Sequence, residues 1–121
     1  MDLLTVNKAI YNKIVQLDKA CKNLAILADK KAETVSVYEK EMATTIIRLK
    51  NGVMFVIDGE EIINPQTTIT EKIAKGICWK MRQEADLAES MYKNQIVVID
   101  VCKAQLNGWQ SINKYLSEVL K

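Results

Sequence analysis

Three cysteines are the residues of this chain best suited to metal or redox chemistry, and the sequence contains no histidine to join them. Cys21, Cys78 and Cys102 lack the C-x-x-C spacing of zinc and redox sites, so we expect no metal and no cofactor. We instead expect three buried, reduced thiols that pack as small hydrophobic groups.

One cluster of acidic residues lies beside a basic residue: Arg82 is followed by Glu84, Asp86 and Glu89. Residues two apart on a helix point away from each other, and neither a histidine nor a nucleophile accompanies these carboxylates. A solvated helix face explains them better than an acid–base pair. We therefore expect no catalytic residues and no enzyme activity.

Basic residues flank the point where we expect the chain to turn back, and they are the candidate contacts for a partner or a nucleic acid: Arg48, Lys50, Lys72, Lys75, Lys80 and Arg82. Nearby carboxylates would offset much of the field that binding to phosphates requires, namely Glu41, Glu60, Glu61, Glu71 and Glu84. The net charge is only +2. Nucleic-acid binding is therefore an alternative that we do not favour.

Two tryptophans stand close to glycines, Trp79 after Gly76 and Trp109 after Gly108. Tryptophan dominates many binding hot spots but also packs in helix–helix cores, and core packing is the favoured explanation. Because Trp79 lies off the main apolar seam, it is the better candidate for an exposed contact.

The elements that carry these residues are predicted to be long helices in a single domain, residues 1–121. Only one proline and four glycines occur in 121 residues, too few for the turns of a sandwich or barrel. No basic, apolar leader precedes the first helix, and the longest apolar run, residues 53–57, is too short to span a bilayer. We expect a cytoplasmic protein that does not enter membranes.

A first helix is predicted over about residues 3–50, because apolar residues recur there at alternating four- and three-residue steps. That spacing places them on one stripe: Ile10, Ile14, Leu17, Cys21, Leu24, Ala28, Val35, Tyr38, Met42 and Leu49. Gly52 is predicted to end the helix by adopting a left-handed conformation.

A β-hairpin is predicted over about residues 53–63, because Asp58-Gly59 separates two apolar, β-branched runs. Thr68 and Glu71 then form a capping-box pattern at the start of a second helix, which extends to about residue 120. Asn107-Gly108 is a candidate for a break in this helix. Its apolar seam comprises Ala74, Cys78, Met81, Ala85, Ala88, Tyr92, Ile99, Cys102, Leu106, Trp109, Leu116 and Leu120.

Further apolar residues lie off both seams and widen the apolar surface beyond what two helices can cover: Leu4, Val6, Leu27, Ile46, Ile47, Ile73, Ile77, Ile96, Val97, Val98 and Val101. The fold class predicted is therefore mainly all-α, an antiparallel hairpin of long helices with a short β-hairpin at the bend. We expect a homodimer that forms a four-helix bundle.

One stretch of the second helix, R-x-x-x-D-x-A-E-x-x-Y from Arg82 through Asp86, Ala88 and Glu89 to Tyr92, resembles a pattern in small phage and prophage proteins of low-GC Gram-positive bacteria. The resemblance implies two helices joined by a short connector and no established activity. It also implies a place among early recombination or replication functions. This chain departs from the pattern by carrying the Asp-Gly hairpin in the connector.

Together these observations favour a non-enzymatic, homo-oligomeric interaction module that binds another protein, for instance a replication, recombination or host-defence factor. The alternative is an accessory protein that binds nucleic acid through the basic residues near the bend. The sequence does not identify the partner.

Overall fold

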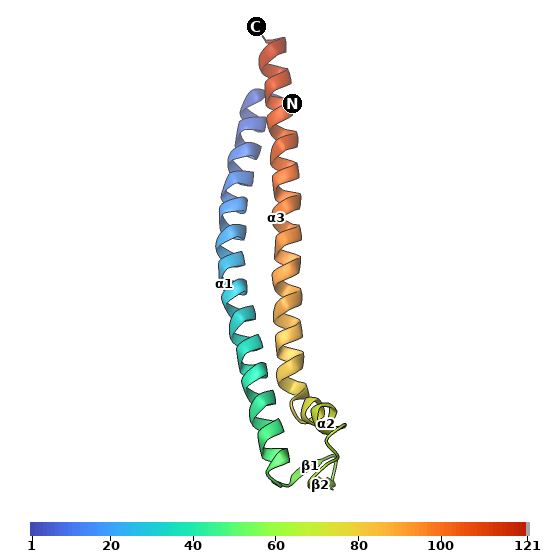
Figure 1. The fold of residues 1–121 in the computed structure, drawn as a ribbon. Coiled ribbons are helices and arrows are strands. Elements are labelled where there is room, and N and C mark those ends of the chain that lie inside the picture. The colour runs from blue at the N-terminus through green and yellow to red at the C-terminus, as the bar shows by residue number, and fades with distance from the viewer. Residues whose placement is uncertain (121) are drawn as a thin grey trace. The chain divides into compact units, whose positions relative to one another are not determined.

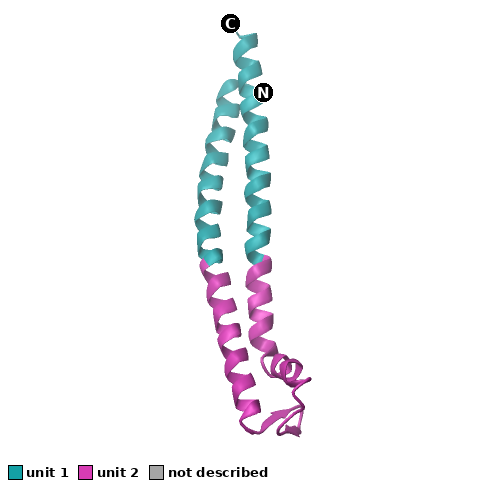
Figure 2. Ribbon diagram, viewed as in Figure 1, with its two compact units in different colours: residues 1–28, 91–121 teal, residues 29–90 magenta. Residues whose placement is uncertain are grey.

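The computed structural model describes residues 1–120, and it contains long helices together with one small antiparallel sheet (Figure 1). The elements are α1 (Leu3–Lys50), β1 (Phe55–Ile57), β2 (Glu60–Ile62), α2 (Thr70–Ile77) and α3 (Trp79–Val119). The chain divides into two compact units (Figure 2). Unit 1 comprises residues 1–28 and 91–121, and unit 2 comprises residues 29–90, so each unit contains part of α1 and part of α3. The prediction of a mainly helical chain with a β-hairpin is confirmed.

Helix α1 has a defined signal at each end. At its start, the Asp2 carboxylate accepts a hydrogen bond of 2.7 Å from the backbone N–H of Thr5, which satisfies one of the free donors of the first turn. At its end, Gly52 has φ of +81°, and its N–H donates to the carbonyl of Leu49. The N–H of Val53 donates to the carbonyl of Arg48. These two bonds form a Schellman motif, which confirms Gly52 as the predicted helix stop.

The β-hairpin forms around the predicted Asp-Gly pair. Asp58 and Gly59 both have positive φ, 50° and 80°, as a two-residue hairpin turn requires. The register pairs Phe55 with Ile62 and Ile57 with Glu60. Residues 53, 54 and 63 lie outside the strands, which are therefore shorter than the predicted range of 53–63.

The predicted second helix is instead two helices. It begins at Thr70 rather than near Thr68, because residues 67–69 form a turn and no side chain caps the first turn of α2. The chain then breaks at Cys78, whose φ of −91° and ψ of 18° depart from the helix. By contrast, α3 continues through Asn107-Gly108, so the break proposed there is wrong. Around Gly108 there is open space, and a glycine without strain costs too little to end a helix that is otherwise favourable.

Unit 2 has its core where the end of α1 meets α2 and the start of α3. Leu49 and Ala74 are completely buried, and Ala85 and Ala88 are nearly so. Thr45, a polar interruption of the predicted seam, lies in this core with its hydroxyl 3.4 Å from the Cys78 thiol. The hairpin reaches α2 through Ile57, whose Cδ1 lies 4.0 Å from the position that a Cβ on Gly76 would take.

Unit 1 is a simple pair of antiparallel helix segments, α1 against α3 (Figure 2). Val6, Ile99 and Cys102 are its buried apolar residues. The seam predicted for α3 is confirmed in this unit from Tyr92 to Leu116, whose positions are buried or half-buried. Leu120 is the exception, with 70% of its surface exposed.

The seam predicted for α1 is partly wrong in unit 1. Ile14 and Cys21 are exposed, whereas Lys13 and Ala20, one residue earlier, are half-buried. Ile10, Leu17 and Leu24 belong to both possible phases of the repeat, so the apolar pattern alone could not choose between them. The structure adopts the phase that includes Lys13 and Ala20, and both residues make polar contacts in it.

Candidate protein-binding surfaces

Side-chain hydrogen bonds join α1 to α3 within unit 1, and they include a weak one of 3.6 Å from the Cys102 thiol to the Lys13 carbonyl. The Gln95 amide donates to the backbone carbonyl of Ala20 at 3.0 Å, and the small side chain of Ala20 leaves room for it. The Lys13 ammonium donates to Gln105 at 2.6 Å. Asn113 donates to Asn7 at 2.6 Å. A polar residue in a helix–helix seam fixes which residues face each other, so these bonds define the register of unit 1.

A second stripe of residues repeats along α3 and is exposed over its whole length. We call it the α3 stripe, and it consists of Met91, Asn94, Val98, Val101, Gln105, Gly108, Ile112, Tyr115 and Val119. Its steps alternate between three and four residues, the spacing by which one helix packs against another. Six of the nine residues are large and apolar, and Tyr115 is 65% exposed. In unit 1 no part of the described chain covers this stripe.

The α3 stripe lies beside the seam that packs against α1. Each of its first eight residues comes one position before a seam residue, as Val98 precedes Ile99 and Val101 precedes Cys102. One residue is a rotation of about 100° in an α-helix. Helix α3 therefore has two packing faces roughly at right angles, as a helix has when it contacts two other helices in a bundle.

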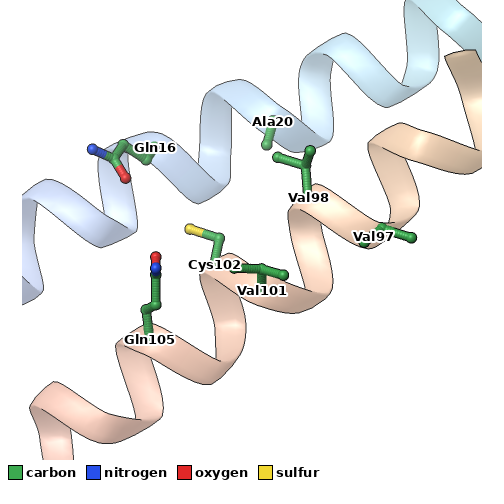
Figure 3. A pocket seen from close by; sticks show the side chains of 7 residues that line it. All are labelled: Gln16, Ala20, Val97, Val98, Val101, Cys102 and Gln105. Atoms are coloured by element: carbon green, nitrogen blue, oxygen red, sulfur yellow. The ribbon is translucent and has the colours of Figure 1, made fainter.

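A shallow hollow of about 270 Å³ lies between the α3 stripe and α1 (Figure 3). Val98 and Ala20 point toward each other across it. Gln16 of α1 lines the hollow together with Val98 and Gln105. Gln16 comes one residue before Leu17, which packs against α3. Residues of α1 that come one position before a packed residue therefore lie on the same face of unit 1 as the α3 stripe.

Two exposed residues of α1, Ile14 and Cys21, are on the opposite face of unit 1. Ile14 and Cys21 each come one residue after a packed position, Lys13 and Ala20, which rotates them away from Gln16. Ile14 is 49% exposed. It therefore serves as a matched comparison for Val98, which is 51% exposed on the α3 stripe.

Unit 2 has a separate hollow beside the β-hairpin. Val56, Ile57 and Asp58 line it from the hairpin, and Gly76, Ile77 and Trp79 line it from α2 and α3. Trp79 is 61% exposed and Val56 60%. The prediction that Trp79 is the exposed tryptophan is confirmed, and Trp109 is half-buried in the seam as expected.

The six basic candidates all lie in unit 2 and are exposed, namely Arg48, Lys50, Lys72, Lys75, Lys80 and Arg82. Lys75 forms an ion pair with Glu71 at 3.6 Å, and Arg82 forms one with Asp86 at 3.8 Å. These neighbours neutralise two of the six cations, so the structure adds no support for the nucleic-acid alternative.

The acidic residues and cysteines that were considered for chemistry do not come together in one site. Asp86 pairs with Arg82, and Glu84 is exposed on the same helix. The prediction of three buried thiols is wrong for Cys21, which is exposed because α1 packs in the other phase. Cys78 and Cys102 are buried and free, as predicted.

Among the described residues, no helix has an apolar stretch long enough to cross a membrane.

Only part of the α3 stripe is evident from the sequence. Val97, Val98 and Val101 stand out as apolar residues off the seam, but the repeat up to Val119 does not. The signal was available, because the same three- and four-residue steps recur one position before the packed seam. Asn94, Gln105 and Gly108 interrupt the apolar pattern and conceal it.

Comparisons with protein-family models, with curated proteins and with solved structures found no match to this chain, so the phage resemblance stays a prediction and the function is argued from these surfaces.

Proposed function

We propose that this chain is a non-enzymatic protein-binding module that assembles through helix–helix contacts and works as a homo-oligomer, most simply a dimer with four long helices. The observation that carries the proposal is the α3 stripe, nine exposed positions with the spacing of a packed seam. An exposed repeat of this length on a soluble helix is typical of a surface that another protein covers.

The hollow of unit 2 is the surface we assign to a further protein partner. Trp79 offers a large, half-apolar side chain beside the hairpin, and residues of this type dominate the binding energy of many interfaces. Replication, recombination and defence factors remain the partner classes we propose from the resemblance of the second helix to phage proteins.

The experiment that tests self-association compares two single substitutions of equal exposure. Val98→Glu places a carboxylate in the α3 stripe, and Ile14→Glu places one on the opposite face of unit 1. A carboxylate buried without a partner weakens an interface by about 100-fold or more, so Val98→Glu should yield monomers in light scattering. Ile14→Glu should keep the mass of the parent. Equal masses for both variants would show that the α3 stripe is not the interface.

A further inference from the structure

We infer that the α3 stripe is covered by the α3 stripe of a second copy, running antiparallel, with Gln105 of each chain packed over Gly108 of the partner subunit. This inference rests on the proposed function and names the partner and the register of that surface. It follows from the order of large, small and polar residues along the stripe.

In an antiparallel pair of helices, the residues of one stripe meet those of the other in reverse order. One register gives Gln105 opposite Gly108 of the partner subunit at the centre. The next layer on each side pairs Val101 with Ile112 of the partner subunit, and the following layer pairs Val98 with Tyr115 of the partner subunit. Four apolar layers thus enclose two central layers in which a long side chain faces a glycine, and in the outermost layers Asn94 comes opposite Val119 of the partner subunit.

The central layers have a precedent within the chain. In unit 1 the Gln95 amide lies against Ala20 and donates to its backbone carbonyl at 3.0 Å. Gly108 leaves even more room, because nothing lies within 4 Å of the position that a Cβ on it would take. The side-chain oxygen of Gln105 accepts a hydrogen bond from Lys13 of its own chain, so its amide N–H groups remain to donate to backbone carbonyls of the partner subunit's helix, as Gln95 donates to Ala20.

The flanking positions are compatible with the same register. Ala104 comes opposite Ser111 of the partner subunit, and Val97 comes opposite Glu118 of the partner subunit. No two like charges face each other, and the small residues near the centre allow the two helices to approach closely.

Other arrangements are less complementary. A parallel pair would place Gly108 opposite Gly108 of the partner subunit, which leaves a gap, and Asn94 opposite Asn94 of the partner subunit. An antiparallel pair shifted by one heptad would place Gly108 opposite Val98 of the partner subunit and Gln105 opposite Val101 of the partner subunit, so no long side chain would fill the space beside the glycine.

The stripe is long enough for a stable pair. Residues 91–119 span about 42 Å at 1.5 Å per residue. Two such helices in contact over that length bury an area comparable with the roughly 800 Å² per partner of ordinary stable interfaces.

Cysteine cross-linking tests the register directly. Two chains are prepared in a background with Cys21→Ser, Cys78→Ala and Cys102→Ala, one carrying Val101→Cys and the other Ile112→Cys. We expect disulfide-linked dimers after oxidation of the mixture, and little cross-linking of either chain alone. Efficient cross-linking of each chain by itself would indicate a parallel pair and overturn the inference.

A second pair of variants needs no change of the native cysteines. Gly108→Leu adds apolar area but collides with Gln105 of the partner subunit, so it should raise the dissociation constant at least tenfold relative to Gly108→Ala. Adding Gln105→Ala to the Gly108→Leu chain should restore the dimer. A Gly108→Leu chain that dimerises more tightly than the alanine variant would reject the register.

Light scattering on the same samples separates the two proposals. A parent chain that stays monomeric would reject self-association itself. A dimer that cross-links in the wrong pairs would reject only the antiparallel register and leave the proposed function in place.

Discussion

Gln95 shows how a single polar residue contributes to the packing of unit 1. It occupies a seam position on α3 where an apolar residue is expected, and its amide donates to the Ala20 carbonyl. A half-buried amide that loses its partner costs more than the bond is worth, so such a residue favours one alignment of the two helices over shifted ones.

Gln95→Ala should lower the free energy of unfolding by about 1–2 kcal/mol, because it removes the hydrogen bond and leaves a gap beside Ala20. Gln83→Ala, at an exposed position of the same helix, should change it by less than about 0.5 kcal/mol. Urea denaturation measures both values. Equal losses in the free energy of unfolding would mean that the hydrogen bond of the Gln95 amide makes no special contribution.

The two tryptophans should respond differently to truncation. Trp109 is half-buried in the seam, so Trp109→Ala should cost about 2–3 kcal/mol of stability. Trp79 is 61% exposed, so Trp79→Ala should cost less than about 1 kcal/mol. Thermal unfolding followed by circular dichroism compares them. A larger loss for Trp79 would contradict its assignment as a surface contact.

Asp2 makes the start of α1 sensitive to pH. Its hydrogen bond from the Thr5 backbone N–H holds the pKa of the carboxyl below its usual value of 3.8. A lowered pKa in the folded state means that the cap is fully effective above pH 3.8 and is lost as the pH falls through the lower value. The protection of the Thr5 amide against hydrogen exchange should follow this course.

Asp2→Asn provides the control, because an asparagine caps a helix without titrating in this range. Its Thr5 amide should show the same protection at pH 5 and at pH 3. Identical pH profiles for the parent and this variant would exclude the carboxylate as the cap.

At the level of the elements, glycines with different backbone conformations should respond to alanine in opposite ways. Gly52 has φ of +81°, which an alanine adopts only with strain, so Gly52→Ala should destabilise the chain by about 1 kcal/mol. Gly76 is within α2 and its added Cβ would meet Ile57 at an ordinary distance of 4.0 Å. Gly76→Ala should therefore stabilise by about 0.5–1 kcal/mol. Chemical denaturation gives the sign of each change.

Those elements that depend on local residue types were predictable from the sequence. Asp58-Gly59 specifies the hairpin and Gly52 the end of α1, because each requires a positive φ that few residues accept. The seam of α3 was also predictable from Tyr92 to Leu116, although a second repeat, the α3 stripe, runs one position before it.

Elements that depend on tertiary contacts were not predictable from the sequence. The phase of α1 in unit 1 is decided by Lys13 and Ala20, whose contacts with α3 no local pattern reveals. The break at Cys78 lies where the Thr45 hydroxyl meets the Cys78 thiol, a contact between residues 33 positions apart. The exposed position of Cys21 follows from the phase of α1 in the same way.

At the scale of the whole chain, the candidate site is a surface rather than a cleft. The sequence predicted unmatched apolar surface and self-association, but it did not locate the α3 stripe, because three polar or small residues interrupt its repeat. Large apolar residues that are exposed, such as Met91, Val98 and Tyr115, lower the solubility of a chain. A second helix that covers them removes this effect.

The most direct test of self-association is the mass of the unmodified chain by sedimentation equilibrium, from low-micromolar to submillimolar concentration. We expect a species of twice 13.7 kDa that dissociates only on dilution, because mass action governs any reversible dimer. A mass of 13.7 kDa at every concentration would contradict the account.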